Sequence, residues 1–181
     1  GLHALLNGIA WLQSGMCNQF LVGASEAPLT PFTLSQMLAL KVYSNEDNAL
    51  ANRCLDFEKT SNTMVLGEAA ACLSLSLSSE KAIAKITGIG FATEILSSST
   101  SISTEADCFQ KSMKMAIGSY AVDDIDAIVM HAPGTIKGDL YEWQAIQQVF
   151  SHEKPMCTTN KWKIGHTLGA SGILSLHMAV L

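Results

Sequence analysis

The sequence lacks the features of several large protein classes. Its 11 basic residues are outnumbered by 16 acidic ones, giving a formal net charge of −5. With no basic excess to neutralise a phosphate backbone, nucleic acid is not an expected partner. No apolar run reaches the roughly 18 to 20 residues that cross a bilayer, so no membrane association is expected. The N-terminal Gly-Leu-His has no signal-peptide pattern, which favours a cytoplasmic protein.

Paired cysteines and clustered metal ligands are also missing. The five cysteines have no Cys-x-x-Cys spacing, and their odd number favours reduced, inert thiols over a disulfide framework. They are Cys17, Cys54, Cys72, Cys108 and Cys157. The acidic run Asp123, Asp124 and Asp126 lacks the glycine and terminal glutamate of a calcium loop, so it is interpreted as a solvated turn. We therefore expect no bound metal.

What the chain does contain is the composition of a globular α/β protein, 48% apolar and 15% charged over 181 residues. Apolar residues at steps of three and four predict a helix over residues 2–12 that ends near Gly15. A short strand is predicted at 20–22, a central strand at 64–77 and a long strand at 84–93. Residues 32–62 are mixed in character and are assigned only short helical turns.

The second half of the chain alternates between the two types of element. A polar loop over 97–104 precedes a predicted helix over 105–120. Strands are predicted at 126–130 and 156–160, with a helix over 140–150 between them, and a helix follows from Gly165 to Leu181. This alternation predicts a parallel sheet with right-handed crossovers.

Two familiar motifs are incomplete. Gly88 and Gly90 follow a predicted strand, but the third glycine and the later acidic residue of a dinucleotide site are missing. The Gly-x-Ser-x-Gly turn of a serine hydrolase is missing as well. His3 and His177 lie in apolar helical runs and His152 in a polar turn, so structural roles are favoured for all three.

Two other histidines occupy positions that suit function. His131 directly follows a predicted strand, where open α/β sheets place ligand-binding groups. His166 stands between Gly165 and a stretch of small residues that would allow close approach of a ligand or backbone. Taken singly, His131 could equally be a solvated loop histidine, and His166 could equally be a structural histidine at a helix start.

Taken together, the two histidine segments resemble the paired signatures of the β-ketoacyl synthase family. The matching residues are His131, Gly134, Thr135, Gly138, Asp139 and Glu142 in the first segment, and Lys161, Gly165, His166, Gly169, Ala170 and Gly172 in the second. The resemblance extends over nearly the whole chain. It includes Leu-Val-Gly-Ala-Ser-Glu-Ala at 21–27, Arg53 with Asp56, and the small-residue run at 64–75.

This resemblance implies an α/β fold of the thiolase-like type, present in part. Residues 1–83 would end the N-terminal half of its layered αβαβα architecture, and residues 84–181 would form most of the C-terminal half. It also places the nucleophilic cysteine about three residues before Gly1, and the last strands after Leu181. We therefore expect the 181-residue polypeptide alone to be inactive. Ala132 and Pro133 depart from the family pattern, and Pro133 offers no hydroxyl to a pantetheine arm.

The activity implied is a decarboxylative Claisen condensation of an acyl thioester with malonyl-acyl carrier protein. His131 and His166 would donate hydrogen bonds to the thioester oxygen, each contributing roughly 3 kcal/mol, which requires their rings to lie about 4 to 7 Å apart. Lys161 would form an ion pair with Glu142, with Asp139 in support, and Thr135 would contact the phosphopantetheine arm. The carrier protein would deliver that arm, so the resemblance implies no other cofactor.

The same resemblance implies a homodimer, or a heterodimer with another ketosynthase-like subunit. Two alternatives remain open. One is a non-catalytic subunit that resembles a chain-length factor and keeps the fold without the cysteine. The other is a thiolase-like degradative enzyme, which would use a second cysteine near its C-terminus. The two histidines and Lys161 favour the condensing enzyme.

Overall fold

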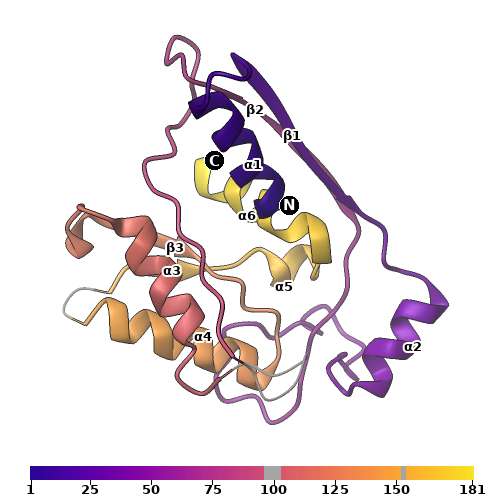
Figure 1. The fold of residues 1–181 in the computed structure, drawn as a ribbon. Coiled ribbons are helices and arrows are strands. Elements are labelled where there is room, and N and C mark those ends of the chain that lie inside the picture. The colour runs from indigo at the N-terminus through magenta and orange to yellow at the C-terminus, as the bar shows by residue number, and fades with distance from the viewer. Residues whose placement is uncertain (96–102, 152–153) are drawn as a thin grey trace.

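The computed structural model describes residues 1–95, 103–151 and 154–181 (Figure 1). His152 and most of the polar loop predicted over 97–104 lie outside the described residues. The elements in chain order are α1 (Leu2–Gln13), β1 (Gln19–Glu26), α2 (Pro31–Ala39), β2 (Ala69–Ser76), α3 (Asp107–Ile117), η1 (Val122–Asp124), β3 (Ala127–Val129), α4 (Ile136–Val149), β4 (Met156–Thr158), α5 (Lys161–Ile164), η2 (Leu168–Ala170) and α6 (Ser171–Val180). None of the described helices combines the length and apolarity that crossing a bilayer requires.

Strands β1 and β2 form a long antiparallel ladder in which Gln19 faces Ser76 and Glu26 faces Ala69. Side chains alternate between the two faces of a strand, so every second residue points to the same side. One face packs against α1 and α6 around the buried residues Leu5, Val22 and Ile173. The other face is open, and Leu21 is 71% exposed there.

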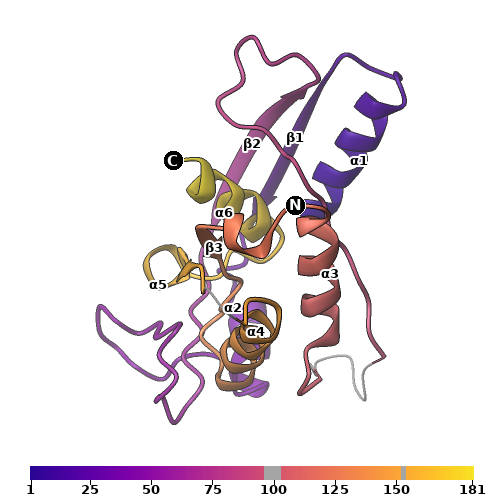
Figure 2. The same cartoon turned by 90° about the vertical axis from the view of Figure 1, so that its left-hand side faces the viewer.

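Strands β3 and β4 pair in parallel, and α4 connects them. Their core contains Met130, Ile146 and Phe150, with Met113 of α3 packed against it. Helices α3 and α4 lie side by side beside this second sheet (Figure 2). Helix α6 contacts both β2 and β3, so it connects the two sheets.

Several predicted elements are confirmed. These are the helix at the start of the chain, the helix after the polar loop, the strand before His131 and the strand at 156–158 with its parallel partner. The helix predicted over 140–150 begins earlier, at Ile136, because the hydroxyl of Thr135 caps it by accepting a hydrogen bond from the Gly138 N–H.

Three predicted elements are wrong or shortened. The strand predicted over 84–93 is not formed, because that segment has no hydrogen-bonded strand partner among the described residues. It runs along α3 instead, where a Cβ at Gly88 or Gly90 would lie 1.8 Å from a helix carbonyl oxygen. Only Ala69–Ser76 of the strand predicted over 64–77 pairs with β1. The helix predicted from Gly165 begins at Ser171, since Gly165 (φ +74°) and Leu168 (φ +38°) are left-handed.

Candidate active site

His131 lies just beyond the carboxyl end of β3, as its position in the sequence predicts. Its loop is held by one carboxylate of α4. The Glu142 side chain accepts the backbone N–H of His131 through Oε1 and that of Ala132 through Oε2, both at 2.7 Å. Ala132 is fully buried with φ +27°, a conformation that an L-residue adopts at a cost. Strain of this kind persists where the surrounding contacts fix the backbone, and here Glu142 supplies them.

His166 is fixed by backbone pairing with the segment that leads into β2. Its N–H donates to the Val65 carbonyl at 2.7 Å, and its own carbonyl accepts the Gly67 N–H at 3.1 Å. A Cβ at Gly67 would lie 1.9 Å from the Ile164 carbonyl oxygen, so this close approach requires glycine. The close approach of the backbone at Gly67 therefore helps to hold the second histidine.

The hydrogen bonds of His166 determine which ring nitrogen carries the proton. Its Nδ1 accepts the Leu168 backbone N–H at 3.0 Å and lies 3.2 Å from the Ser171 hydroxyl. A backbone N–H can only donate, so Nδ1 is unprotonated and the neutral ring carries its proton on Nε2. His166 is thereby prepared to donate a hydrogen bond from Nε2.

The two rings face each other closely. Their centroids are 4.9 Å apart and their planes meet at 80°, which confirms the predicted spacing of about 4 to 7 Å. Burial and the nearby Lys161 ammonium lower the pKa of His166 to about 4. Burial, Lys161 and His166 lower the pKa of His131 to about 3. Solvent reaches His131, which offsets part of this desolvation, whereas His166 is only 9% exposed. Both imidazoles are therefore neutral at pH 7.

The predicted ion pair between Lys161 and Glu142 is not formed. Glu142 is occupied by the two backbone N–H groups of the His131 loop, and among the described residues the Lys161 ammonium has no hydrogen-bond partner. Lys161 is nevertheless 1% exposed. Burial lowers its pKa, and the Glu142 charge opposes that change. Burial in turn raises the pKa of Glu142, although the two backbone hydrogen bonds and the Lys161 charge act to lower it. Lys161 and Glu142 thus interact through their charges without a direct contact, because the backbone N–H groups of the loop occupy the carboxylate.

Asp139 and Thr135 lie on the same side of α4 as Glu142. Asp139 is fully buried, and its Oδ1 accepts the Gly134 N–H at 2.9 Å. The Thr135 hydroxyl accepts the Gly138 N–H at 3.2 Å, which leaves its own proton available to a ligand. The first predicted segment therefore folds into one loop, which helix α4 holds through the carboxylates of Glu142 and Asp139.

The start of α1 belongs to the same region. A Cβ at Gly1 would lie 2.8 Å from the carbonyl oxygen of Gly169, three residues beyond His166. The first helix therefore begins against the second histidine loop. Burial and the Asp139 charge raise the pKa of the Cys54 thiol to about 11, although the nearby Lys161 charge acts to lower it. Cys54 stays protonated at neutral pH and is a poor nucleophile.

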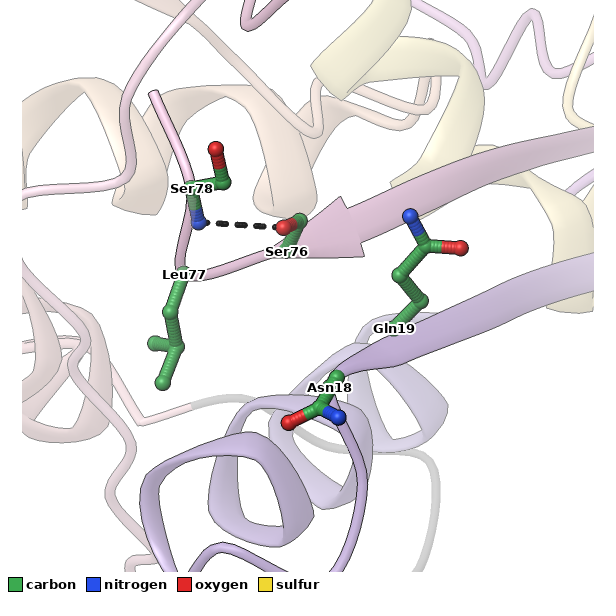
Figure 3. Close-up of a pocket in the computed structure, with 5 residues that line it drawn as sticks. All are labelled: Asn18, Gln19, Ser76, Leu77 and Ser78. Carbon is green, nitrogen blue, oxygen red and sulfur yellow. Dashed lines mark hydrogen bonds between the residues drawn. The ribbon is translucent and has the colours of Figure 1, made fainter. Parts of the chain in front are cut away.

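A hollow of about 480 Å³ lies at the opposite end of the long ladder (Figure 3). It is lined by Asn18, Gln19, Ser76, Leu77 and Ser78, none of which titrates near neutral pH. The Glu26 end of the same strand reaches the second histidine loop, where Glu26 Oε2 accepts the Gly169 N–H at 3.1 Å. The candidate catalytic side chains therefore lie at the Glu26 end of the ladder, away from this hollow.

Comparison with known proteins identifies the family of the chain. Residues 1–81 match the N-terminal domain of β-ketoacyl synthases, and residues 83–181 match the C-terminal domain. The chain belongs to the β-ketoacyl synthase family. A putative polyketide beta-ketoacyl synthase 1 of Streptomyces cyaneus is 29% identical over 196 residues, which cover 100% of this chain and 45% of that protein. A 3-oxoacyl-[acyl-carrier-protein] synthase 2 of Staphylococcus aureus is 26% identical over 182 residues, covering 95% of this chain and 45% of that protein.

Solved structures agree on the fold of this β-ketoacyl synthase chain. A type II polyketide ketosynthase in complex with its acyl-carrier protein superposes with a TM-score of 0.89 at 24% identity, covering 99% of this chain and 47% of that one. The ishigamide ketosynthase/chain length factor gives a TM-score of 0.83 at 20% identity, with coverages of 100% and 44%. The thiolase-like fold is confirmed, and the chain spans a little less than half the length of these relatives.

Two further residues, which the sequence does not single out, support the histidine site. Lys59 donates to Asp139 Oδ2 at 2.7 Å, and Asn52 donates through Nδ2 to the Lys161 carbonyl at 3.0 Å. Both lie in a polar stretch to which no periodicity could be assigned. Their partners are 80 and 109 residues away in the chain, so no local pattern indicates the contacts.

Proposed function

We propose that the complete protein containing this chain is a β-ketoacyl-acyl carrier protein synthase, which condenses an acyl thioester with malonyl-acyl carrier protein and releases CO₂. The observation that carries the proposal is the pair of neutral imidazoles, His131 and His166, with ring centroids 4.9 Å apart. Two neutral N–H donors at this separation can both reach one thioester oxygen.

The proposed reaction needs that pair at one step. When the malonyl carbon–carbon bond breaks and CO₂ leaves, its electron pair moves into an enolate whose charge rests on the thioester oxygen. The Nε2–H of His166 and the ring N–H of His131 would donate to that oxygen, each contributing roughly 3 kcal/mol. The enolate carbon then attacks the acyl carbon, and the thiolate that held the acyl group leaves.

Lys161 would stabilise the neutral form of both rings. Burial and, after it, the positive charge of Lys161 lower the pKa of His131 and of His166, so neither ring is charged at pH 7. A neutral ring keeps a proton to donate and does not repel the Lys161 ammonium. The lysine would thus act on the histidines through space, without the ion pair to Glu142 that the sequence predicted.

The phosphopantetheine arm of an acyl carrier protein would enter beside Thr135. The Thr135 hydroxyl still has its proton to give, whereas Pro133 has none, so one hydroxyl donor rather than two would meet the arm. The carrier protein as partner, a dimer with a second ketosynthase-like subunit and a cytoplasmic location belong to the same proposal. The cysteine that accepts the acyl group is proposed to lie outside these 181 residues.

The test is a condensation assay with the complete protein, an acyl-acyl carrier protein and malonyl-acyl carrier protein labelled in its free carboxyl group. We expect release of labelled CO₂ together with a β-ketoacyl thioester. A folded protein that binds the carrier but forms no product, even though both histidines are present, would instead match the non-catalytic subunit. Carrier-independent cleavage of a β-ketoacyl thioester by coenzyme A would match the degradative enzyme.

A further inference from the structure

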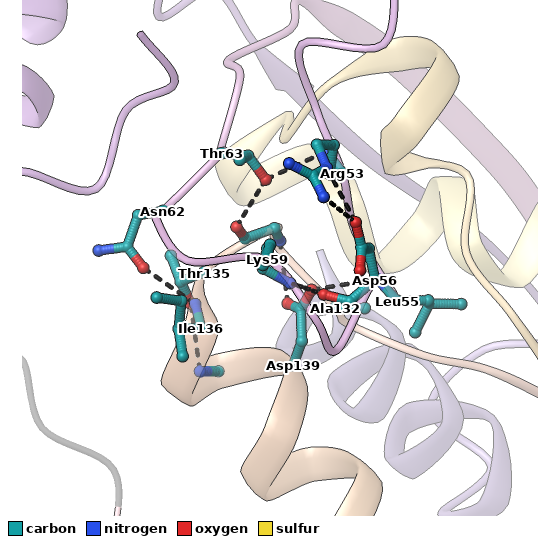
Figure 4. Close-up of polar contacts among 12 residues, drawn as sticks. Arg53, Leu55, Asp56, Lys59, Asn62, Thr63, Ala132, Thr135, Ile136 and Asp139 are labelled. Carbon is teal, nitrogen blue, oxygen red and sulfur yellow. Dashed lines mark hydrogen bonds and ion pairs between the residues drawn. The ribbon is translucent and has the colours of Figure 1, made fainter. Parts of the chain in front are cut away.

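One segment of the chain, residues 52–63, contacts the loop that follows His131 (Figure 4) and also the helix that precedes His166. At one end, the N–H and hydroxyl of Thr63 both donate to the Gly134 carbonyl, at 2.9 and 3.0 Å. The Asn62 side chain accepts the Ile136 N–H at 2.9 Å. At the other end, Asn52 donates to the Lys161 carbonyl at 3.0 Å. The segment therefore connects the His131 loop with the helix that precedes His166.

The centre of this connection is the Asp139 carboxylate, which accepts three hydrogen bonds. Its Oδ1 accepts the Gly134 N–H at 2.9 Å, and its Oδ2 accepts the Leu55 N–H at 3.1 Å and the Lys59 ammonium at 2.7 Å. The side chains of Lys59 and Asp139 are 2% and 0% exposed. Lys59 also donates to the Asp56 carbonyl at 3.0 Å, which fixes its direction.

Two carboxylates on one face of α4 thus hold the His131 loop. Glu142 accepts the first two N–H groups of this loop, and Asp139 accepts the N–H of Gly134. The two carboxylates lie one helical turn apart on α4. Of these two carboxylates, only Asp139 has a cation in direct contact among the described residues, and that cation is Lys59. A buried carboxylate without a partner is unstable as an anion and would take up a proton or draw in water.

We propose that Lys59 is a positioning residue for His131. Its ammonium binds the Asp139 carboxylate and holds it in place, so that the carboxylate holds Gly134 and the loop holds the imidazole opposite His166. Lys59 takes no part in the chemistry, because its ammonium is already bonded to Asp139 and to the Asp56 carbonyl. The expected effect on turnover rests on the proposed function, whereas the effect on the geometry of the site does not.

The test compares variants of the complete protein. Lys59→Met removes the charge and leaves Asp139 alone. Lys59→Met/Asp139→Asn removes both charges and so avoids an unpaired buried anion. Lys111→Met is the matched control, because it breaks the exposed ion pair with Asp107 at 3.5 Å in α3. The two imidazoles are titrated by NMR, and kcat and KM are measured for condensation.

Loosening of the loop lets more water reach the rings, so we expect the pKa of His131 to rise by about one pH unit in both Lys59 variants. We also expect kcat to fall about tenfold or more, with KM changed less than threefold. Lys111→Met leaves all three quantities unchanged. If Lys59→Met does not fold, the double variant decides. If the pKa of His131 is unchanged in either folded Lys59 variant, the proposal is overturned, even if that variant is less stable. If the unmodified protein has no condensing activity, the proposed function fails, while the titrations still decide the role of Lys59.

Discussion

The imidazole rings of His131 and His166 lie 4.9 Å apart, although 34 residues separate them in the chain. Each is held by the backbone of its own loop, His131 through Glu142 and His166 through Val65 and Gly67. A rigid pair of donors needs no rearrangement when charge develops on a bound oxygen, which is the condition for strong electrostatic stabilisation.

Removal of either ring should therefore abolish most of the condensation. In the complete protein we expect His166→Ala to lower kcat about 10²- to 10³-fold, since one oxyanion donor is lost. His131→Ala should act similarly, and the double variant should cost less than the product of the two effects, because the rings act on one oxygen. His177→Ala, in α6, is the control. Losses below about fivefold for both single variants would contradict the assignment.

Stability should depend on pH through these rings. Unfolded histidine has a pKa of about 6.5, whereas that of His166 in the folded chain is about 4. Below pH 6.5 the unfolded state takes up a proton that the folded state does not, so stability falls as pH falls from about 6.5 to about 4. The slope from His166 is at most about 1.4 kcal/mol per pH unit, and the slope from His131 is smaller because solvent reaches that ring.

Urea unfolding at pH 7, 6 and 5 measures this slope. His166→Asn removes the titrating group and should flatten the curve between pH 5 and pH 6.5, whereas His3→Asn, at an exposed position in α1, should not. A His166→Asn curve that keeps the full slope would show that other groups cause the pH dependence.

Lys161 should not stabilise the fold, but it should be needed to keep the pKa values of both imidazoles low. Lys161→Met removes a buried ammonium that makes no hydrogen bond among the described residues, so we expect the free energy of unfolding to stay the same or to rise by about 1 kcal/mol. The pKa of both imidazoles should rise, because the ammonium lowers them. Lys163→Met, at an exposed position two residues on, should change neither quantity. Unchanged imidazole titration in Lys161→Met would refute its role.

Gly134 should tolerate no side chain. It has φ +93°, and a Cβ there would lie 2.5 Å from the Asn52 side-chain oxygen and 3.1 Å from the Thr63 carbonyl oxygen. We expect Gly134→Ala to lower the free energy of unfolding by about 3 kcal/mol, from backbone strain and displaced neighbours together. Gly15→Ala is the matched control, because Gly15 has φ +73° with nothing within 4 Å, and should cost only about 1 kcal/mol. An equal loss in the free energy of unfolding at the two positions would show that the neighbours of Gly134 can move to accommodate a methyl group.

The sequence alone was sufficient for the local elements and for the two histidines. The helix at 2–13 and the strand before His131 follow from apolar periodicity, which depends only on near neighbours in the chain. The paired histidine signatures lie in two short segments, so their residues could be recognised together before any contact between them was known.

Tertiary structure decided the contacts between segments. The sequence paired Lys161 with Glu142 on charge alone, but two backbone N–H groups of the adjacent loop lie closer to that carboxylate. Lys59 and Asp139 meet across 80 residues, and no local pattern encodes the pair. The strand predicted over 84–93 fails for the same reason, because a strand forms only where another backbone supplies its hydrogen bonds. Periodicity reports which face of a segment is buried, while the partner that buries it is fixed only when the whole chain packs.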